Sequence, residues 1–320
     1  MTHTLRPRRS ALYIPGNNRR ALEKAKTLSA DVLIFDLEDA VGPDAKADSR
    51  ALVCETISFD SYRPREIVVR INGPGTDWHD DDVAAVARSS ADGMLVPKVE
   101  GGQQVQALAD ALDAHNAPES LRLWAMIETP KAFLRAEEIA SASDRLAVLV
   151  IGTNDLVNDL HGLHVPGRAP IVPALSLAAL GARAAGKAIL DGVFNGIADE
   201  AGFAAEARQG REMGFDGKTL IHPSQVARAN DVFGPSPKEL ADARQVVSAY
   251  ERLRPQGIVS LWSMAAWSRA CTCATPTGSL PLTLSFPNGR YSTESSRQRI
   301  SATYGWVQPM ACRGSAVAAS

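Results

Sequence analysis

Short apolar runs and amphipathic segments alternate along the first 250 residues of the chain. Segments such as 19–28, 45–57 and 200–213 have helical spacing, whereas the apolar runs between such segments have the length of β-strands. The predicted strands are residues 11–14, 32–37, 67–71, 94–96, 121–127, 146–151, 188–194 and 217–221. Eight strand–helix units in about 240 residues predict the α/β class and a TIM (β/α)8 barrel.

A doubly wound sheet is the alternative arrangement of such units. It is less well supported, because the first predicted strand is followed by Pro15-Gly16-Asn17-Asn18. That turn lacks the G-x-G-x-x-G spacing with which a Rossmann fold binds a dinucleotide.

Composition and charge exclude some of the functional classes to which the chain could belong. The 320 residues carry 34 Lys+Arg and 36 Asp+Glu, a formal net charge of -2. This balance gives no general attraction to nucleic acid or to an anionic membrane. No apolar run approaches the roughly 20 residues of a membrane span, and no signal core follows the basic N-terminus. We therefore expect a cytoplasmic enzyme with neither nucleic acid nor membrane as a partner.

Polar residues follow nearly every predicted strand, as expected for a barrel whose active site lies at the C-terminal ends of its strands. Glu128 and Asp155 follow the fifth and sixth strands. Two carboxylates with room for water and a chelating substrate suit Mg²⁺. Alternatively, each carboxylate caps a helix or forms an ion pair.

Three basic residues follow other strands of the predicted barrel. Arg70 is suited to bind a substrate carboxylate or carbonyl oxygen, or to pair with Glu38 or Asp39 one strand away. Lys98 fits a structural cation better than a Schiff base. His222, which precedes a proline, either acts as a base or holds its loop and touches substrate through its backbone; the latter is favoured.

Seven motifs in this order resemble the HpcH/HpaI aldolase/citrate lyase family, which includes the citrate lyase β-subunit and malyl-CoA lyases. The motifs are RSALYIPG from Arg9, ADVLIFDLEDAV ending at Val41, VVRING ending at Gly73, LVPKVE ending at Glu100, AMIETP ending at Pro130, VIGTNDL ending at Leu156 and GFDGKTLIHPSQV ending at Val226. Together they cover about residues 9–253, the predicted barrel domain.

The resemblance implies a divalent cation, Mg²⁺ or Mn²⁺, held by Glu128 and Asp155, with Arg70 as the substrate anchor. The three are the implied catalytic residues. Further implied contacts to the substrate or its CoA group are Tyr13, Lys24, Asn154, Ile221 and His222. Asn18 departs from the pattern, since many members have an arginine there. The resemblance also implies a homo-oligomer, trimeric or hexameric.

The implied reaction is the reversible cleavage of a 3-hydroxyacyl-CoA, of the citryl-CoA or malyl-CoA type, into an acyl-CoA and a 2-oxo acid. A cation there would act as Lewis acid and template. Two alternatives stay open: a malyl-CoA thioesterase, and an impaired barrel that only binds the metal and the CoA ester. No base for the hydroxyl proton is evident within the barrel.

The segment 254–320 differs sharply from the rest of the chain. It has no lysine, a single acidic residue, three of the 5 Trp and three of the 4 Cys. Its patterning is too weak to predict a packed domain. In malyl-CoA lyase-like members, a C-terminal V-D-G-R/K-M-V/I motif covers a neighbouring subunit's site and supplies an acid/base aspartate; here that motif is missing.

We predict that this tail is the product of a shifted reading frame. The third base of each codon, read with the first two bases of the next, turns Met264-Ala265 into an obligatory glycine. Over residues 262–268, the same frame permits V-D-G-R-M-V, the missing motif. A genuine but divergent extension is the alternative.

Overall fold

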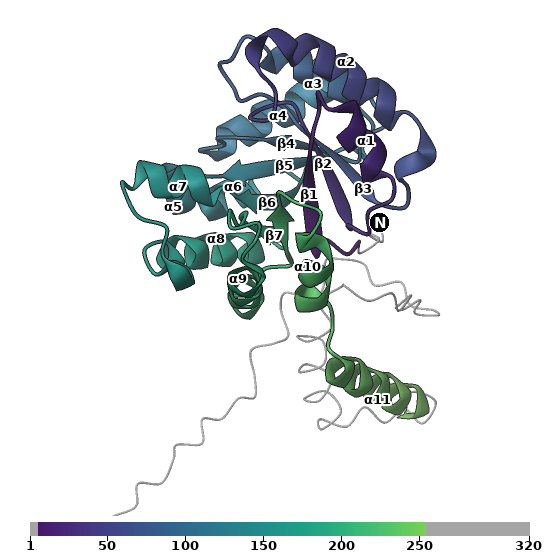
Figure 1. Cartoon of the computed structure of the whole chain (residues 1–320), viewed down its shortest axis with the longest axis vertical. Helices are drawn as coiled ribbons and strands as arrows, with labels where there is room; N and C mark the ends of the chain where they lie inside the picture. Colours follow the sequence, from purple (N-terminus) through teal and green to yellow (C-terminus); the bar gives the residue numbers. More distant parts are fainter. Residues whose placement is uncertain (1–5, 254–320) are drawn as a thin grey trace, which may run out of the picture. The chain divides into compact units, whose positions relative to one another are not determined.

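The computed structural model describes residues 6–253, and in them eight parallel strands close into a barrel in the order β1-β2-β3-β4-β5-β6-β7-β8 (Figure 1). The strands are β1 Ser10–Pro15, β2 Val32–Asp36, β3 Glu66–Arg70, β4 Gly93–Val96, β5 Arg122–Ile127, β6 Leu146–Ile151, β7 Ala188–Asp191 and β8 Gly217–Leu220. β8 pairs with β1 and closes the barrel. The prediction of a TIM barrel is confirmed, and the predicted tail 254–320 lies outside the described residues.

Helices follow the strands, and those up to residue 233 lie around the barrel (Figure 1). The α-helices are α1 Arg19–Ala25, α2 Lys46–Ile57, α3 His79–Ala87, α4 Gly102–Ala114, α5 Pro130–Leu134, α6 Ala136–Ser141, α7 Thr153–Asp159, α8 Val172–Ala184, α9 Glu200–Glu212, α10 Gln225–Phe233 and α11 Pro237–Leu253. Three 3₁₀ turns join them: η1 Pro43–Ala45, η2 Asp60–Tyr62 and η3 Pro166–Arg168. Within the described residues, no helix combines the length and apolarity needed to cross a membrane.

Alternation along the strands divides the apolar side chains between two cores. On β2, Leu33 and Phe35 belong to the large core between strands and helices, whereas Val32 and Ile34 belong to a smaller cluster inside the barrel. Successive side chains of a strand face opposite sides. Position 36, two residues beyond Ile34, therefore faces the barrel interior at its C-terminal mouth.

β7 is shorter than predicted, ending at Asp191 rather than at residue 194. Asp191 is fully buried and accepts hydrogen bonds from Arg168 at 2.6 Å and Lys218 at 3.1 Å. Its Oδ1 also accepts the N–H of Gly192 at 2.9 Å, which turns the chain away from the sheet. The polar side chain that ends this strand therefore belongs to an ion cluster with Arg168 and Lys218, on the face of the strand opposite to the barrel interior.

Candidate active site

Strand alternation brings four polar side chains to the mouth of the barrel. The interior cluster contains Ala11, Val68 and Met126, and the residues two positions further along the chain are Tyr13, Arg70 and Glu128. Asp36 reaches the same level on β2, where the sheet register pairs it directly with Arg70. Four strands distant in sequence thus supply one site, as in other TIM barrels.

Glu128 is a buried carboxyl group held from the neighbouring strand end. Its Oε1 accepts the backbone N–H of Lys98 at 2.8 Å, and Lys98 adopts a left-handed conformation with φ 54°. Burial, then the charge of nearby Asp155, raises the pKa of Glu128 to about 8. An acid with its charge disfavoured in this way is suited to bind a cation.

Asp155 lies in the first turn of α7 and is half-buried. Its negative charge is close enough to Glu128 to raise the pKa of Glu128. Among residues 6–253, no group of three or more His, Cys, Asp or Glu side chains is arranged to hold a metal ion. Two carboxylates are nevertheless a suitable donor set for Mg²⁺, which commonly keeps several water ligands. The residues present therefore fit a hard divalent cation.

Gly152 leaves the space that the Glu128 side chain occupies. A Cβ atom at this position would lie 2.5 Å from Glu128 Cβ and 2.6 Å from its Oε2. Both separations are shorter than van der Waals contact, so only glycine allows the two strand ends to approach this closely.

We expect Gly152→Ala to displace Glu128 and to remove the effect of Mg²⁺ on thermal stability. Overpacking of this kind costs about 1–3 kcal/mol in folding free energy. Thermal unfolding with and without Mg²⁺ measures both effects. Gly42→Ala is the matched control, because a Cβ there meets nothing within 4 Å; an unchanged Mg²⁺ response in Gly152→Ala would contradict the prediction.

Arg70 is surrounded by carboxylates. Its Nε and Nη2 donate to the two oxygens of Asp36 at 2.7 and 2.6 Å. Its Nη1 contacts Glu38 at 2.8 Å and Asp39 at 3.1 Å. Both predicted ion pairs are present, and Asp36 is a third partner that the sequence analysis missed. Although burial alone lowers the pKa of Arg70, Asp36 and its neighbours keep it well above its usual value.

These contacts restrict how Arg70 can bind a substrate. Three of the five N–H donors of the guanidinium form hydrogen bonds, two to Asp36 and one to Asp39, and Nη1 also forms the ion pair with Glu38. An incoming oxygen can therefore use the second hydrogen on Nη1 or Nη2, or displace Asp39, whose side chain is 77% exposed. The Arg70 guanidinium also lies over the ring of Tyr13, 4.9 Å from its centroid, so Tyr13 lines the same part of the mouth.

We expect Arg70→Lys to weaken the binding of a CoA ester by about 10- to 100-fold, because an ammonium group cannot reproduce the planar fork. The fold should survive with a lower melting temperature, since Asp36 keeps a cationic neighbour. Isothermal titration with a CoA ester measures the first effect. Arg183→Lys alters a more exposed pair with Asp216 and serves as the control; equal dissociation constants for parent and Arg70→Lys would exclude Arg70 from the site.

The other predicted contact residues are exposed. Asn154 exchanges two hydrogen bonds with Asn195, at 2.8 and 3.3 Å. Lys24 projects from α1, and Ile221 directly follows β8. His222 Nδ1 accepts the N–H of Ser224 at 3.2 Å and lies 2.8 Å from its hydroxyl group, which fits the favoured role of holding the loop. In the described part of the chain, no hydrogen bond or ion pair joins Lys24, Ile221 or His222 to Glu128 or Arg70.

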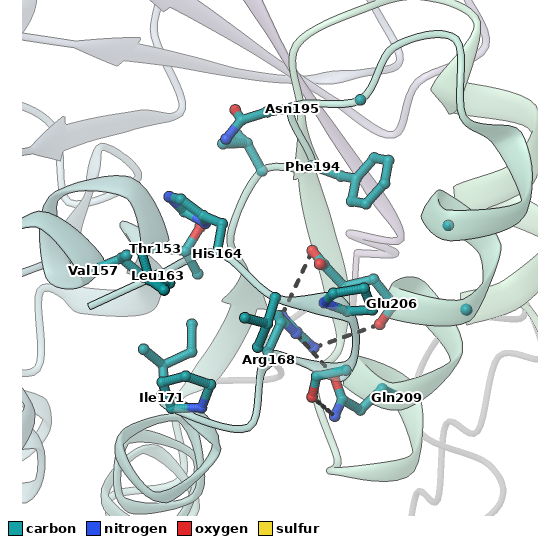
Figure 2. A pocket seen from close by; sticks show the side chains of 18 of the residues that line it. Thr153, Val157, Leu163, His164, Arg168, Ile171, Phe194, Asn195, Glu206 and Gln209 are labelled. Atoms are coloured by element: carbon teal, nitrogen blue, oxygen red, sulfur yellow. Dashed lines mark hydrogen bonds and ion pairs between the residues drawn. The ribbon is translucent and has the colours of Figure 1, made fainter.

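A cavity of about 440 Å³ lies beside the mouth, between α7, the η3 loop and α9. Figure 2 shows Arg168 in this cavity, linked to Glu206 and Gln209. Thr153 and Asn195 line it, but neither Glu128 nor Asp155 does. The carboxylate pair therefore belongs to the barrel mouth and not to this cavity.

Comparisons with known proteins agree with the motifs. The chain is 48% identical over 257 residues to a (3S)-malyl-CoA thioesterase of Cereibacter sphaeroides, covering 80% of this chain and 88% of the relative. It is 35% identical to the citrate lyase subunit beta of Escherichia coli strain K12 over 258 residues, 79% of this chain and 85% of the relative.

Solved structures show the same architecture. A citrate lyase beta subunit from Mycobacterium tuberculosis, complexed with oxaloacetate and magnesium, matches with a TM-score of 0.62 and 31% identity over 72% of this chain and 98% of that one. The CitE protein of the same organism, in complex with magnesium, acetoacetate and coenzyme A, matches with a TM-score of 0.66 and 30% identity over 86% of this chain and 99% of that one.

The family model described as HpcH/HpaI aldolase/citrate lyase matches residues 9–223, which is more than half of the 320 residues. The barrel, its order of motifs and the relatives at 35–48% identity agree with this match. The chain therefore belongs to the HpcH/HpaI aldolase/citrate lyase family.

Proposed function

We propose that this protein acts on a 3-hydroxyacyl-CoA thioester of the malyl-CoA type, with a divalent cation bound by Glu128 and Asp155. The observation that carries the proposal is the pair of carboxylates at the barrel mouth, buried Glu128 and half-buried Asp155, with the Arg70 cation at the same rim. The names of the relatives support the substrate class: malyl-CoA for one, and oxaloacetate, acetoacetate and coenzyme A for the solved structures.

Thioester hydrolysis is the favoured reaction. The thioesterases are 46–48% identical to this chain, whereas the citrate lyase subunits beta are 33–35% identical. Carbon–carbon cleavage, the reaction first expected from the motifs, is the second candidate. The family description and the solved relative with oxaloacetate favour it.

Magnesium is the proposed cation, with manganese as a substitute, since relatives are solved with magnesium. When bound, the cation would supply Lewis-acid stabilisation of negative charge on substrate oxygens. The protein's part is to hold two carboxylates: Lys98 N–H and Gly152 position Glu128, and α7 positions Asp155.

The remaining residues of the mouth serve substrate binding in this proposal. Arg70 orients an anionic or carbonyl oxygen, and the ring of Tyr13 packs beside it. Asn154 offers an amide next to Asp155. Lys24, Ile221 and His222 are proposed contacts of the CoA portion; their exposure leaves them accessible to a long ligand.

Product analysis after incubation with malyl-CoA and Mg²⁺ tests the proposal. Malate plus free CoA indicates the thioesterase, whereas glyoxylate plus acetyl-CoA indicates the lyase. If neither product pair forms while malyl-CoA and Mg²⁺ bind, the protein is the non-catalytic binder considered above.

A homo-oligomeric state, trimer or hexamer, is proposed by family resemblance, and analytical ultracentrifugation would measure it.

A further inference from the structure

The backbone of Glu38 is fixed from both sides. Asp36 Oδ1 accepts its N–H at 2.9 Å, and the Lys46 ammonium donates to its carbonyl oxygen at 2.7 Å and to that of Leu37 at 2.9 Å. Lys46 is buried. The loop that follows β2 is therefore held around Glu38, and the residue is fixed before any ligand binds.

The side chain of Glu38 is held at the barrel mouth by an ion pair with Arg70. Its Oε2 lies 2.8 Å from Arg70 Nη1, and 17% of the side chain is exposed. The charged groups around it are Arg70 on β3, Asp36 and Asp39 on its own segment, and Lys98 after β4. Tyr13 and Glu128 also lie near Glu38, since the charge of Glu38 raises the pKa of both residues.

Burial is the main reason why the pKa of Glu38 lies at about 7; Arg70 and Lys98 oppose the rise, and Asp39 and Asp36 add to it. The group is therefore divided between acid and carboxylate near neutral pH. Efficient proton transfer requires a group with this property.

We propose that Glu38 is an acid/base group within the barrel mouth of this chain, an inference that rests on the proposed substrate class. In hydrolysis, its carboxylate takes a proton from water while the water oxygen bonds to the thioester carbonyl carbon. The C–S bond then breaks with its electron pair on sulfur, and Glu38 returns the proton to the CoA thiolate. Water is consumed, the carboxylic acid and CoA leave, and Glu38 is again ionised.

The other carboxylates at the mouth are less suited to this role. Both oxygens of Asp36 accept hydrogen bonds from Arg70. Asp39 is mostly exposed, so its environment resembles water. Glu128 and Asp155 are committed to the cation. Glu38 is the carboxylate in the described part of the mouth that combines partial burial, a fixed backbone and one oxygen engaged by a single cation.

The test compares the full chain with Glu38→Gln at saturating Mg²⁺ over a range of malyl-CoA concentrations. Glutamine keeps an acceptor oxygen close to Arg70 Nη1 but cannot take up a proton. We expect kcat to fall by about 10²- to 10⁴-fold with KM changed less than about threefold. The parent should lose kcat/KM as pH falls below about 7, where Glu38 is protonated, and the variant should lack this decline.

Asp39→Asn is the matched control, because it removes the other carboxylate on the same nitrogen, Arg70 Nη1. Its kcat should change far less than that of Glu38→Gln, and the decline below pH 7 should persist. Equal kcat and an equal pH profile for parent and Glu38→Gln would overturn the role of Glu38 but leave the proposed function intact. Absence of any turnover in the parent would overturn the proposed function and this inference together.

Discussion

Replacing Glu128 or Asp155 by alanine is expected to abolish the stabilisation of the protein by Mg²⁺ and a 2-oxo acid. Each residue supplies one of the two carboxylates, and loss of either leaves a hard cation with too few charged oxygens. We expect affinity for Mg²⁺ to fall by more than about 100-fold, because even residues that only support a ligand contribute 10- to 100-fold. Thermal shift and calorimetric titration with Mg²⁺ plus oxaloacetate or glyoxylate measure this loss.

The same site predicts a pH dependence of metal binding in the parent. Burial and Asp155 raise the pKa of Glu128 to about 8, so below that pH the cation must displace a proton. Affinity should therefore decrease as pH falls, by up to about tenfold for each unit below this pKa.

The control for the two alanine variants is Glu119→Ala, which removes an exposed carboxylate at the α4–β5 turn. Unaltered Mg²⁺ binding in both site variants would show that the metal site lies elsewhere.

Restoring the predicted frame is expected to raise turnover by about 10²- to 10⁴-fold, the contribution of a well-positioned acid/base group. One base inserted before the codon of Trp262 makes the new codons begin at each former third base. The tail would then contain V-D-G-R-M-V, whose aspartate supplies acid/base chemistry in the family that this chain resembles. Steady-state kinetics of the restored and original chains with malyl-CoA measure the gain.

The coding DNA tests the frame prediction without any enzyme assay. The motif requires Ser263 to be encoded by TCG, and the alternate frame must stay open through Thr275. Another codon for Ser263, or an earlier stop codon, would rule the shift out and leave the divergent extension. As a kinetic control, the restored frame with asparagine in place of its aspartate should lose the gain.

Much of the fold follows from the chain pattern alone. Strands such as 146–151 are continuous apolar runs because parallel strands of a barrel are buried on both faces, and the structure has this strand at Leu146–Ile151. The end of β7 was mispredicted, because the apolar residues Val193 and Phe194 extend the run. Arg168 and Lys218, distant in sequence, bind the Asp191 carboxylate and end the strand earlier.

The barrel, its family and the candidate residues at the strand ends follow from the order of residues along the chain. Strand alternation and the order of motifs are local properties of a chain, so they can be read without coordinates. The carboxylate pair Glu128 and Asp155 was found in this way, and so were the ion-pair partners Glu38 and Asp39 of Arg70.

The charge states and contacts of those residues depend on the folded barrel. The barrel register sets Asp36 beside Arg70, where its carboxylate accepts hydrogen bonds from Nε and Nη2 of the guanidinium. The closure of the mouth buries Glu38 and Glu128 and raises the pKa of each. The chain pattern cannot supply these properties, because desolvation and Coulomb interactions depend on distances between strands that are far apart in sequence.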